Sequence, residues 1–134
     1  MAAIDHAQAI KNIITTKTTY TGGYFPSTKG INEVNATSKF HIDQGQAVSS
    51  DCYSYTEDFL ITVQSTTAVA LNAMVRTIFK CDTRHHNGFV PNGTHITAND
   101  YPYHLTFQDQ TSEIEVLGPN EFRMKLIVAG AFVT

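Results

Sequence analysis

Two segments of the chain repeat apolar residues at the spacing of an amphipathic α-helix. In the first, residues 3–14, these positions are Ala3, Ala7, Ile10 and Ile14. In the second, residues 68–79, they are Leu71, Met74, Val75 and Ile78. The second segment is also rich in alanine, which favours helix, and one of the hydroxyl residues at 65–67 can cap its start. The pattern therefore predicts two helices, each with one apolar face.

From residue 39 onward, the apolar residues outside the second helix alternate with polar ones, which is typical of half-buried strands. The alternating stretches are 40–42, 53–63, 103–107, 114–116 and 122–128. A short connection lets the first two pair antiparallel, and Gly118-Pro119-Asn120 predicts a turn between the last two. Glu57 interrupts the apolar face of the second stretch, so we expect that half of the strand to be solvated or bulged.

The predicted order, α-β-β-α-β-β-β, is typical of an α+β two-layer sandwich, with a mainly antiparallel sheet packed against two helices. Residues 1–134 form one domain, with long loops at about 17–38 and 82–102. The loop at 17–38 has room for a short strand. The predicted core comprises Ile10, Ile14, Phe59, Ile61, Val63, Leu71, Met74, Val75, Ile78, Leu126 and Val128.

Composition narrows the range of partners. Only 16% of the residues are charged, and the net charge is −3, with lysine and arginine spread singly along the chain. Without a basic cluster, specific binding of nucleic acid is disfavoured. No apolar run is long enough for a membrane helix, and the first residues do not resemble an export signal. We therefore expect Cys52 and Cys81 to be reduced thiols at the edge of packed elements.

The six histidines raise the question of a metal site. Cys81 and His85 have a spacing that could supply two ligands, but His95 lies ten residues beyond His85, in a loop. A structural zinc ion needs four converging ligands, usually at short fixed spacings. The sequence therefore predicts no bound metal and no cofactor.

An enzyme site is also weakly supported. His41 and Asp43 fall on one face of a predicted strand, but Lys39 shares that face, which is typical of a solvated surface. There is no Gly-x-Ser-x-Gly motif, and neither cysteine has a histidine in a recognisable catalytic setting. The sequence predicts that the chain is not an enzyme. A small-ligand enzyme or binding protein of the NTF2-like kind remains the alternative.

Several aromatic and apolar residues lie in the two long loops, where a lone subunit would leave them wet. Tyrosine and phenylalanine are common at protein–protein interfaces. We therefore predict a subunit or partner interface that includes Tyr24, Phe25, Phe89, Val90, Ile96 and Tyr101.

Taken whole, the chain resembles the phage tail-terminator (tail-completion) proteins. The matching features are an amphipathic helix at 3–14, a strand ending in residues 53–63, a helix directly after it at 68–79, and a C-terminal hairpin ending in residues 122–128. The resemblance covers most of the chain, in element order and size. The long loop after the second helix has no clear counterpart.

The resemblance implies a structural virion protein, made in the host cytoplasm, that closes the tail tube at its junction with the head. Its partners would be further copies of itself in a homohexameric ring, the tail tube protein and a head-completion protein. DNA would pass through the ring without specific binding, which the scattered basic residues allow. A head–tail connector or a minor tail subunit would share these features.

Overall fold

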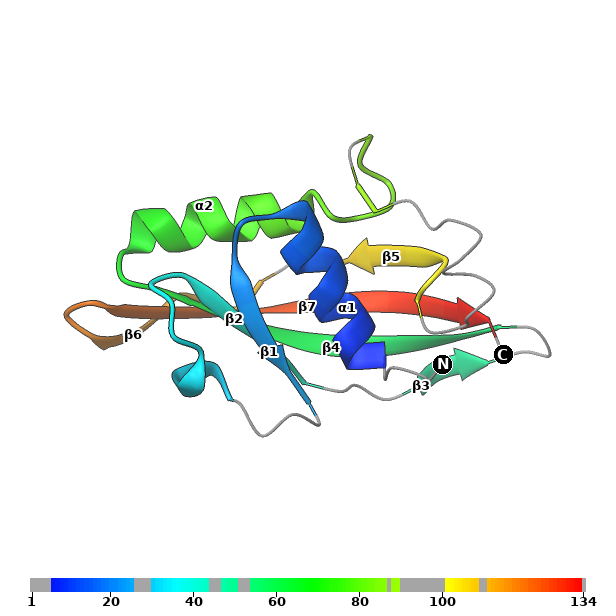
Figure 1. Ribbon diagram of the computed structural model, residues 1–134, viewed down its shortest axis with the longest axis horizontal. Helices are drawn as coiled ribbons and strands as arrows, with labels where there is room; N and C mark the ends of the chain where they lie inside the picture. Colours follow the sequence, from blue (N-terminus) through cyan, green and yellow to red (C-terminus); the bar gives the residue numbers. More distant parts are fainter. Residues whose placement is uncertain are drawn as a thin grey trace.

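The computed structural model describes residues 6–25, 30–43, 47–50, 54–86, 88–89, 101–108 and 111–133. It confirms the predicted α+β class: one mixed, mainly antiparallel sheet packs against two helices on the same face (Figure 1). Neither helix in this part of the chain has the length and apolar character needed to cross a membrane.

The first helix, α1, spans His6–Lys17 and buries the apolar face that the sequence predicts. It runs past the predicted end at Ile14, because Thr15 stays helical and its hydroxyl donates to the carbonyl oxygens of Lys11 and Asn12. The second helix, α2, spans Ala68–Phe79. Its N-cap is Thr67, whose hydroxyl accepts a hydrogen bond from the Ala70 amide, one of the predicted capping positions.

Among the described residues the sheet has seven strands. Their bounds are β1 Thr21–Tyr24, β2 Lys39–Asp43, β3 Ala47–Ser50, β4 Ser54–Ser65, β5 His104–Phe107, β6 Glu115–Gly118 and β7 Glu121–Val133. The long antiparallel pair β4–β7 forms its centre. One side of β4 pairs with β2 and then β3, whereas one side of β7 pairs with β6 and then β5. The predicted antiparallel pairing of residues 40–42 with residues 53–63 is confirmed, since β2 pairs with β4. The predicted hairpin around Gly118 is confirmed as well.

The strand β1 runs parallel to β2, inside the segment expected to be a long connection. A parallel pair needs a crossover, and residues 25–38 supply it, with a short 3-10 helix, η1, at Ile31–Glu33. Gly22 pairs with Phe40, and a Cβ at Gly22 would lie 2.3 Å from the Phe40 ring. Glycine at this position therefore lets the Phe40 ring fill the core beneath β1.

All eleven residues predicted for the core are buried. They form one cluster between the helices and the sheet, together with further side chains such as Phe40, Leu105 and Phe132. Of the two alternatives expected around Glu57, a solvated strand is excluded, since Glu57 is only 9% exposed. The other alternative, an irregular ladder, is found, because β3 shifts register between Ala47 and Ser49 opposite Glu57.

Leu71 tests the packing of α2 on the sheet, because its side chain is completely buried. The substitution Leu71→Ala removes three carbon atoms and leaves a cavity, which costs roughly 2–5 kcal/mol of unfolding free energy. Urea denaturation of the variant and the wild type measures this difference. Val69→Ala, at a highly exposed position on the same helix, is the control and should change stability by less than about 0.5 kcal/mol. A loss as small for Leu71→Ala would contradict the packing.

Candidate functional site

The segment directly after α2 is joined to β5 by a dense set of hydrogen bonds. The Thr83 amide donates to the Leu105 carbonyl oxygen over 2.8 Å, and the Leu105 amide donates to the Thr83 hydroxyl over 3.1 Å. The Phe107 amide donates to Oδ2 of Asp82 over 2.9 Å, and the Arg84 amide donates to Oδ1. The segment therefore covers the edge of β5 and fixes the start of the long loop.

Asp82 is buried, and the Arg84 guanidinium is paired with it: one terminal nitrogen lies 2.8 Å from Oδ2, and the same nitrogen donates to the Phe107 carbonyl oxygen. Burial alone would raise the pKa of Asp82. The hydrogen bonds from the Arg84 side chain, the Phe107 amide and the Arg84 amide, with the guanidinium charge, outweigh burial and lower that pKa below 3.8. Asp82 is therefore a structural carboxylate that is ionised at neutral pH.

A tight turn follows this ion pair and returns the chain to the core. The Phe89 amide donates to the Cys81 carbonyl oxygen, and a Cβ at Gly88 would lie 1.8 Å from the Asp82 carbonyl oxygen. Only glycine allows that close approach of the backbone. The Cys81 thiol is a buried free thiol, and burial raises its pKa to about 11, so it is unreactive at neutral pH.

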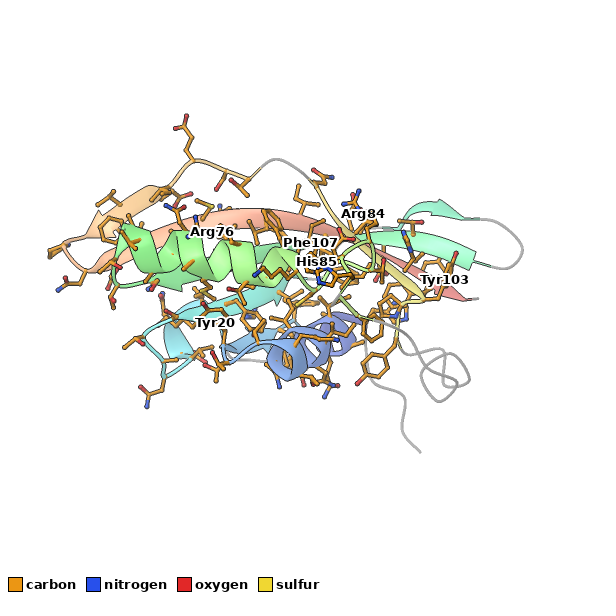
Figure 2. All side chains as sticks on the ribbon, turned by 90° about the horizontal axis from the view of Figure 1, so that it is seen from above. Tyr20, Arg76, Arg84, His85, Tyr103 and Phe107 are labelled. Carbon is orange, nitrogen blue, oxygen red and sulfur yellow. The ribbon has the colours of Figure 1, made fainter. Side chains whose placement is uncertain are left out.

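Beside the ion pair is an open cavity of about 410 Å³. Its lining residues are Phe79, Asp82, Arg84, His85, Phe107 and Gln108. The rings of Phe79 and Phe107 meet edge to face, with centroids 5.5 Å apart, and give the cavity an apolar wall. Figure 2 shows Arg84, His85 and Phe107 gathered beyond the C-terminal end of α2, with Tyr103 farther along the molecule.

The residues predicted for an interface differ in how far the structure exposes them. Phe89 is 6% exposed and belongs to the core, while Tyr101, half-buried, stacks beside it with ring centroids 6.5 Å apart. The Tyr101 hydroxyl accepts a hydrogen bond from the Asn12 side chain of α1. Tyr24 is half-buried and Phe25 is exposed at the end of β1.

Val90 and Ile96 lie outside the described residues. The interface role of the whole set stays a prediction. For Phe89, however, the structure supplies a role inside its own subunit, because its ring reaches the core instead of the surface.

Four exposed apolar residues among those described are missing from the interface prediction, namely Val69, Tyr103, Val116 and Leu117, and the last two are adjacent. Val116 is 68% exposed and Leu117 is 45% exposed, and both lie on β6 beside the turn to β7. The sequence indicated a strand here, but alternation alone does not tell whether anything covers it. In Figure 1 the β6–β7 hairpin projects beyond the N-terminal end of α2, so neither helix covers its tip.

A His–Glu pair also escaped notice, because its members lie 51 residues apart in the sequence. Nδ1 of His6 lies 3.2 Å from Oε2 of Glu57, and the His6 ring stacks on Phe132 with centroids 3.8 Å apart. The Tyr55 hydroxyl lies 3.2 Å from both ring nitrogens of His6. Burial, and then the charge of Glu57, raise the pKa of Tyr55, so its hydroxyl is protonated and can donate. This cluster fastens the start of α1 to the ends of β4 and β7.

His41 and Asp43 share one face of β2, as expected from the sequence, with Nε2 of His41 3.4 Å from Oδ1 of Asp43. The His41 ring is mostly buried, and its Nδ1 atom has no hydrogen-bond partner among the described residues. Neither residue lines the cavity beside Phe107. The His41 ring is therefore largely shielded from solvent, whereas the Asp43 carboxylate beside it is half exposed.

The absence of a metal remains a prediction. Within the described ranges, no three histidine, cysteine or acidic side chains converge as metal ligands do, but His95 lies outside these ranges. The stacked rings of His85 and His86, 4.6 Å apart, belong to neighbouring residues and do not form a chelate by themselves. Protein purified without chelator should hold less than stoichiometric zinc, iron or copper by elemental analysis. One equivalent of metal, lost in His85→Ala, would contradict this expectation.

The chain was compared with protein families, curated proteins and solved structures, and similarity was found only among the solved structures. No protein-family model and no curated protein matches the chain. Among solved structures, the chain is similar to a chain of the "Virion of native gene transfer agent (GTA) particle", with a TM-score of 0.53 and 12% sequence identity. The match covers 93% of this chain and 84% of that one. The α+β sandwich described here is thus a fold that also occurs in a virion-like particle.

Proposed function

We propose that this protein is a structural subunit of a phage-like virion, and specifically a tail terminator. The observation that carries the proposal is the fold shared with a chain of the gene transfer agent particle, over 93% of this chain and 84% of that one. The order of elements agrees with the resemblance seen in the sequence, since the helix that directly follows the central strand and the C-terminal hairpin are both present.

The surface of the subunit supports a role in assembly. The described residues include exposed apolar side chains at several separate places, namely Phe25, Val69, Tyr103, Val116 and Leu117. Exposed apolar side chains that are scattered singly are normal on a monomer, but Val116 and Leu117 are adjacent, and a neighbouring subunit would bury both. We propose that the partners are further copies of the chain in a ring, the tail tube protein and a head-completion protein.

The charges agree with passage of DNA through such a ring. The chain carries a net charge of −3, and its lysine and arginine residues do not follow one another in a basic run. A lumen of this kind would not hold the phosphate backbone, because tight binding needs clustered cations that release counterions.

The mass of the protein in solution tests this proposal. A hexameric ring has six times the 14.8 kDa of the chain, which light scattering or native mass spectrometry resolves from a monomer or dimer. Negative-stain electron microscopy of the same sample should show rings with an open centre. A monomer at concentrations of tens of micromolar would exclude the ring.

The cavity beside Phe107 favours a second candidate, a small-ligand protein of the NTF2-like kind. Its wall combines two aromatic rings with His85 and Arg84, which suits a small polar ligand. Against it, the Asp82 carboxylate is already engaged by two backbone amides and a guanidinium. A monomeric or dimeric protein whose melting temperature rises with a small carboxylic acid would favour this candidate over the terminator.

A head–tail connector or a minor tail subunit would also form a virion component of this fold. The terminator caps the end of a tail, so it should bind tubes assembled from the tail tube protein encoded alongside it. Electron microscopy of the mixture should show rings at one end of each tube. Binding to the head alone would favour the connector.

A further inference from the structure

A second cavity lies beside the start of α2, where four segments that are far apart in the sequence meet. It has a volume of about 480 Å³, which is typical of sites for small ligands. Its lining comes from the loop at 35–37, the start of β2, the end of β4 with residue 66, and the turn at 120–121. It shares no lining residue with the cavity beside Phe107.

Buried polar side chains form part of the wall of this second cavity. Gln64 is 7% exposed and Ser65 is 1% exposed, and they are two of the four buried polar or charged residues in the described part of the chain. The other two, Glu57 and Asp82, belong to the contacts with His6 and Arg84. Burial of a polar side chain costs free energy unless the side chain makes hydrogen bonds. The wall therefore indicates a site built for a polar ligand.

Gln64 is held in one orientation. Its Oε1 accepts hydrogen bonds from Nε and Nη2 of Arg123, over 3.3 and 2.9 Å, and Arg123 also donates to Asn32. Because an arginine side chain only donates, the oxygen of the Gln64 amide must face Arg123, and the Nε2 donor must face elsewhere. No described residue accepts a hydrogen bond from this Nε2. Gln64 therefore offers a fixed donor to a ligand in the cavity that it lines.

Lys39 adds a cation next to this donor. Lys39 and Gln64 lie directly opposite each other in β2 and β4, a position in which Cβ atoms are about 5 Å apart. Lys39 also lines the cavity, and within the described ranges it belongs to no ion pair. An ammonium and an amide donor side by side match the two oxygens of a carboxylate.

Glu121, at the start of β7, gives the cavity a carboxylate of its own. Among the described residues no ion pair joins it to Lys39. The remaining polar side chains of the lining are neutral amides and hydroxyls, such as Asn35 and Asn120. A simple anion would be repelled by Glu121 and a simple cation by Lys39, whereas a ligand with both charges is attracted by both.

We propose that this cavity binds a small zwitterion with the size and charges of an α-amino acid. Its carboxylate accepts hydrogen bonds from Nε2 of Gln64 and from the Lys39 ammonium, and its own ammonium lies beside Glu121. The proposal does not depend on the ring, because a single subunit supplies the whole cavity.

Titration of the full chain with glycine, acetate and methylammonium tests this proposal. Glycine carries both charges at neutral pH, whereas the other two probes carry one charge each. Isothermal calorimetry should show glycine binding at least about tenfold more tightly than either, because only glycine makes both charged contacts. In NMR spectra of the isotopically labelled protein, glycine should shift the backbone amides of residues 64–66 and 120–121.

Two variants separate the site from the fold. Gln64→Glu keeps an acceptor for Arg123 but places a carboxylate where the ligand's carboxylate would bind, and Lys39→Met removes the cation. Each should weaken glycine binding by about tenfold or more. The matched control is Lys125→Met, at an exposed lysine outside the lining, and it should bind glycine as the wild type does.

Circular dichroism checks that each variant is folded, and Lys39→Met decides if Gln64→Glu is not. Three results would each overturn the zwitterion site: no saturable binding of glycine by the wild type, acetate binding as tightly as glycine, or unchanged affinity in the folded cavity variants. None of them affects the proposed function, which the mass of the protein in solution tests separately.

Discussion

Replacing Asp82 with alanine should destabilise the protein by about 3–5 kcal/mol. The carboxylate accepts hydrogen bonds from the Phe107 and Arg84 amides, and hydrogen bonds to a charged group contribute roughly 1.5–3 kcal/mol each. The bond to the Phe107 amide is buried, so its loss leaves a donor without water. The exposed Arg84 guanidinium can return to solvent and adds less. Chemical denaturation of Asp82→Ala and the wild type measures the difference.

Asp82→Asn separates the charge of this residue from its shape. Because the folded state lowers the pKa of Asp82 below 3.8, its ionised form stabilises the fold at every pH above about 3.8. That contribution is lost as the pH falls through the lower, folded-state pKa. The stability difference between the wild type and Asp82→Asn should therefore be constant from pH 7 to pH 5 and shrink below about pH 4. A difference that grows on acidification would contradict the assignment.

The helices and the central strands could be predicted because their signal is local. The apolar side of α2 follows from the spacing of Leu71, Met74 and Ile78, and the inward side of β4 follows from the alternation of Phe59, Ile61 and Val63. Each of these patterns can be recognised within a single helix or strand that has one buried side. The class of fold then follows from the order of these elements.

Two contacts between residues far apart in the sequence, Asp82 with Phe107 and His6 with Glu57, could not be predicted this way. Asp82 lies 25 residues from Phe107, and His6 lies 51 residues from Glu57. The sequence shows an acidic side chain in each case, and an acidic side chain normally indicates exposure. Glu57 is buried instead because α1 places His6 beside its carboxylate. Such a contact depends on how α1 crosses the sheet, which no local period encodes.

The exposure of apolar residues could not be predicted from local patterns either, as Phe89 and Val116 show. Phe89 lies in a loop rich in turn residues, and loop aromatics are common contacts. Gly88 allows the backbone to turn back toward Cys81, and the ring of Phe89 then enters the core. Val116 lies in an ordinary alternating strand, yet its exposure is much larger. Whether a side chain is covered depends on the extent of the helices, and the N-terminal end of α2 stops short of the hairpin tip.

The second large effect is expected at Phe132, near the end of β7. Its ring is fully buried, meets Phe59 edge to face, and stacks with the rings of His6 and Tyr55, which also lie beside each other. The cluster joins α1 to the two central strands at the end of the sheet farthest from the hairpin, so one ring supports three elements.

Phe132→Ala should therefore cost about 3–5 kcal/mol, from the lost burial and the cavity that remains. Phe132→Leu keeps most of the volume and should cost less than half as much. His6→Ala, alone and combined with Phe132→Ala, completes a double-mutant cycle, and the stacked rings should give a coupling of about 0.5–1.5 kcal/mol. A Phe132→Ala loss below about 1 kcal/mol, or a coupling of zero, would show that α1 is held to the sheet by its Ile10 and Ile14 face alone.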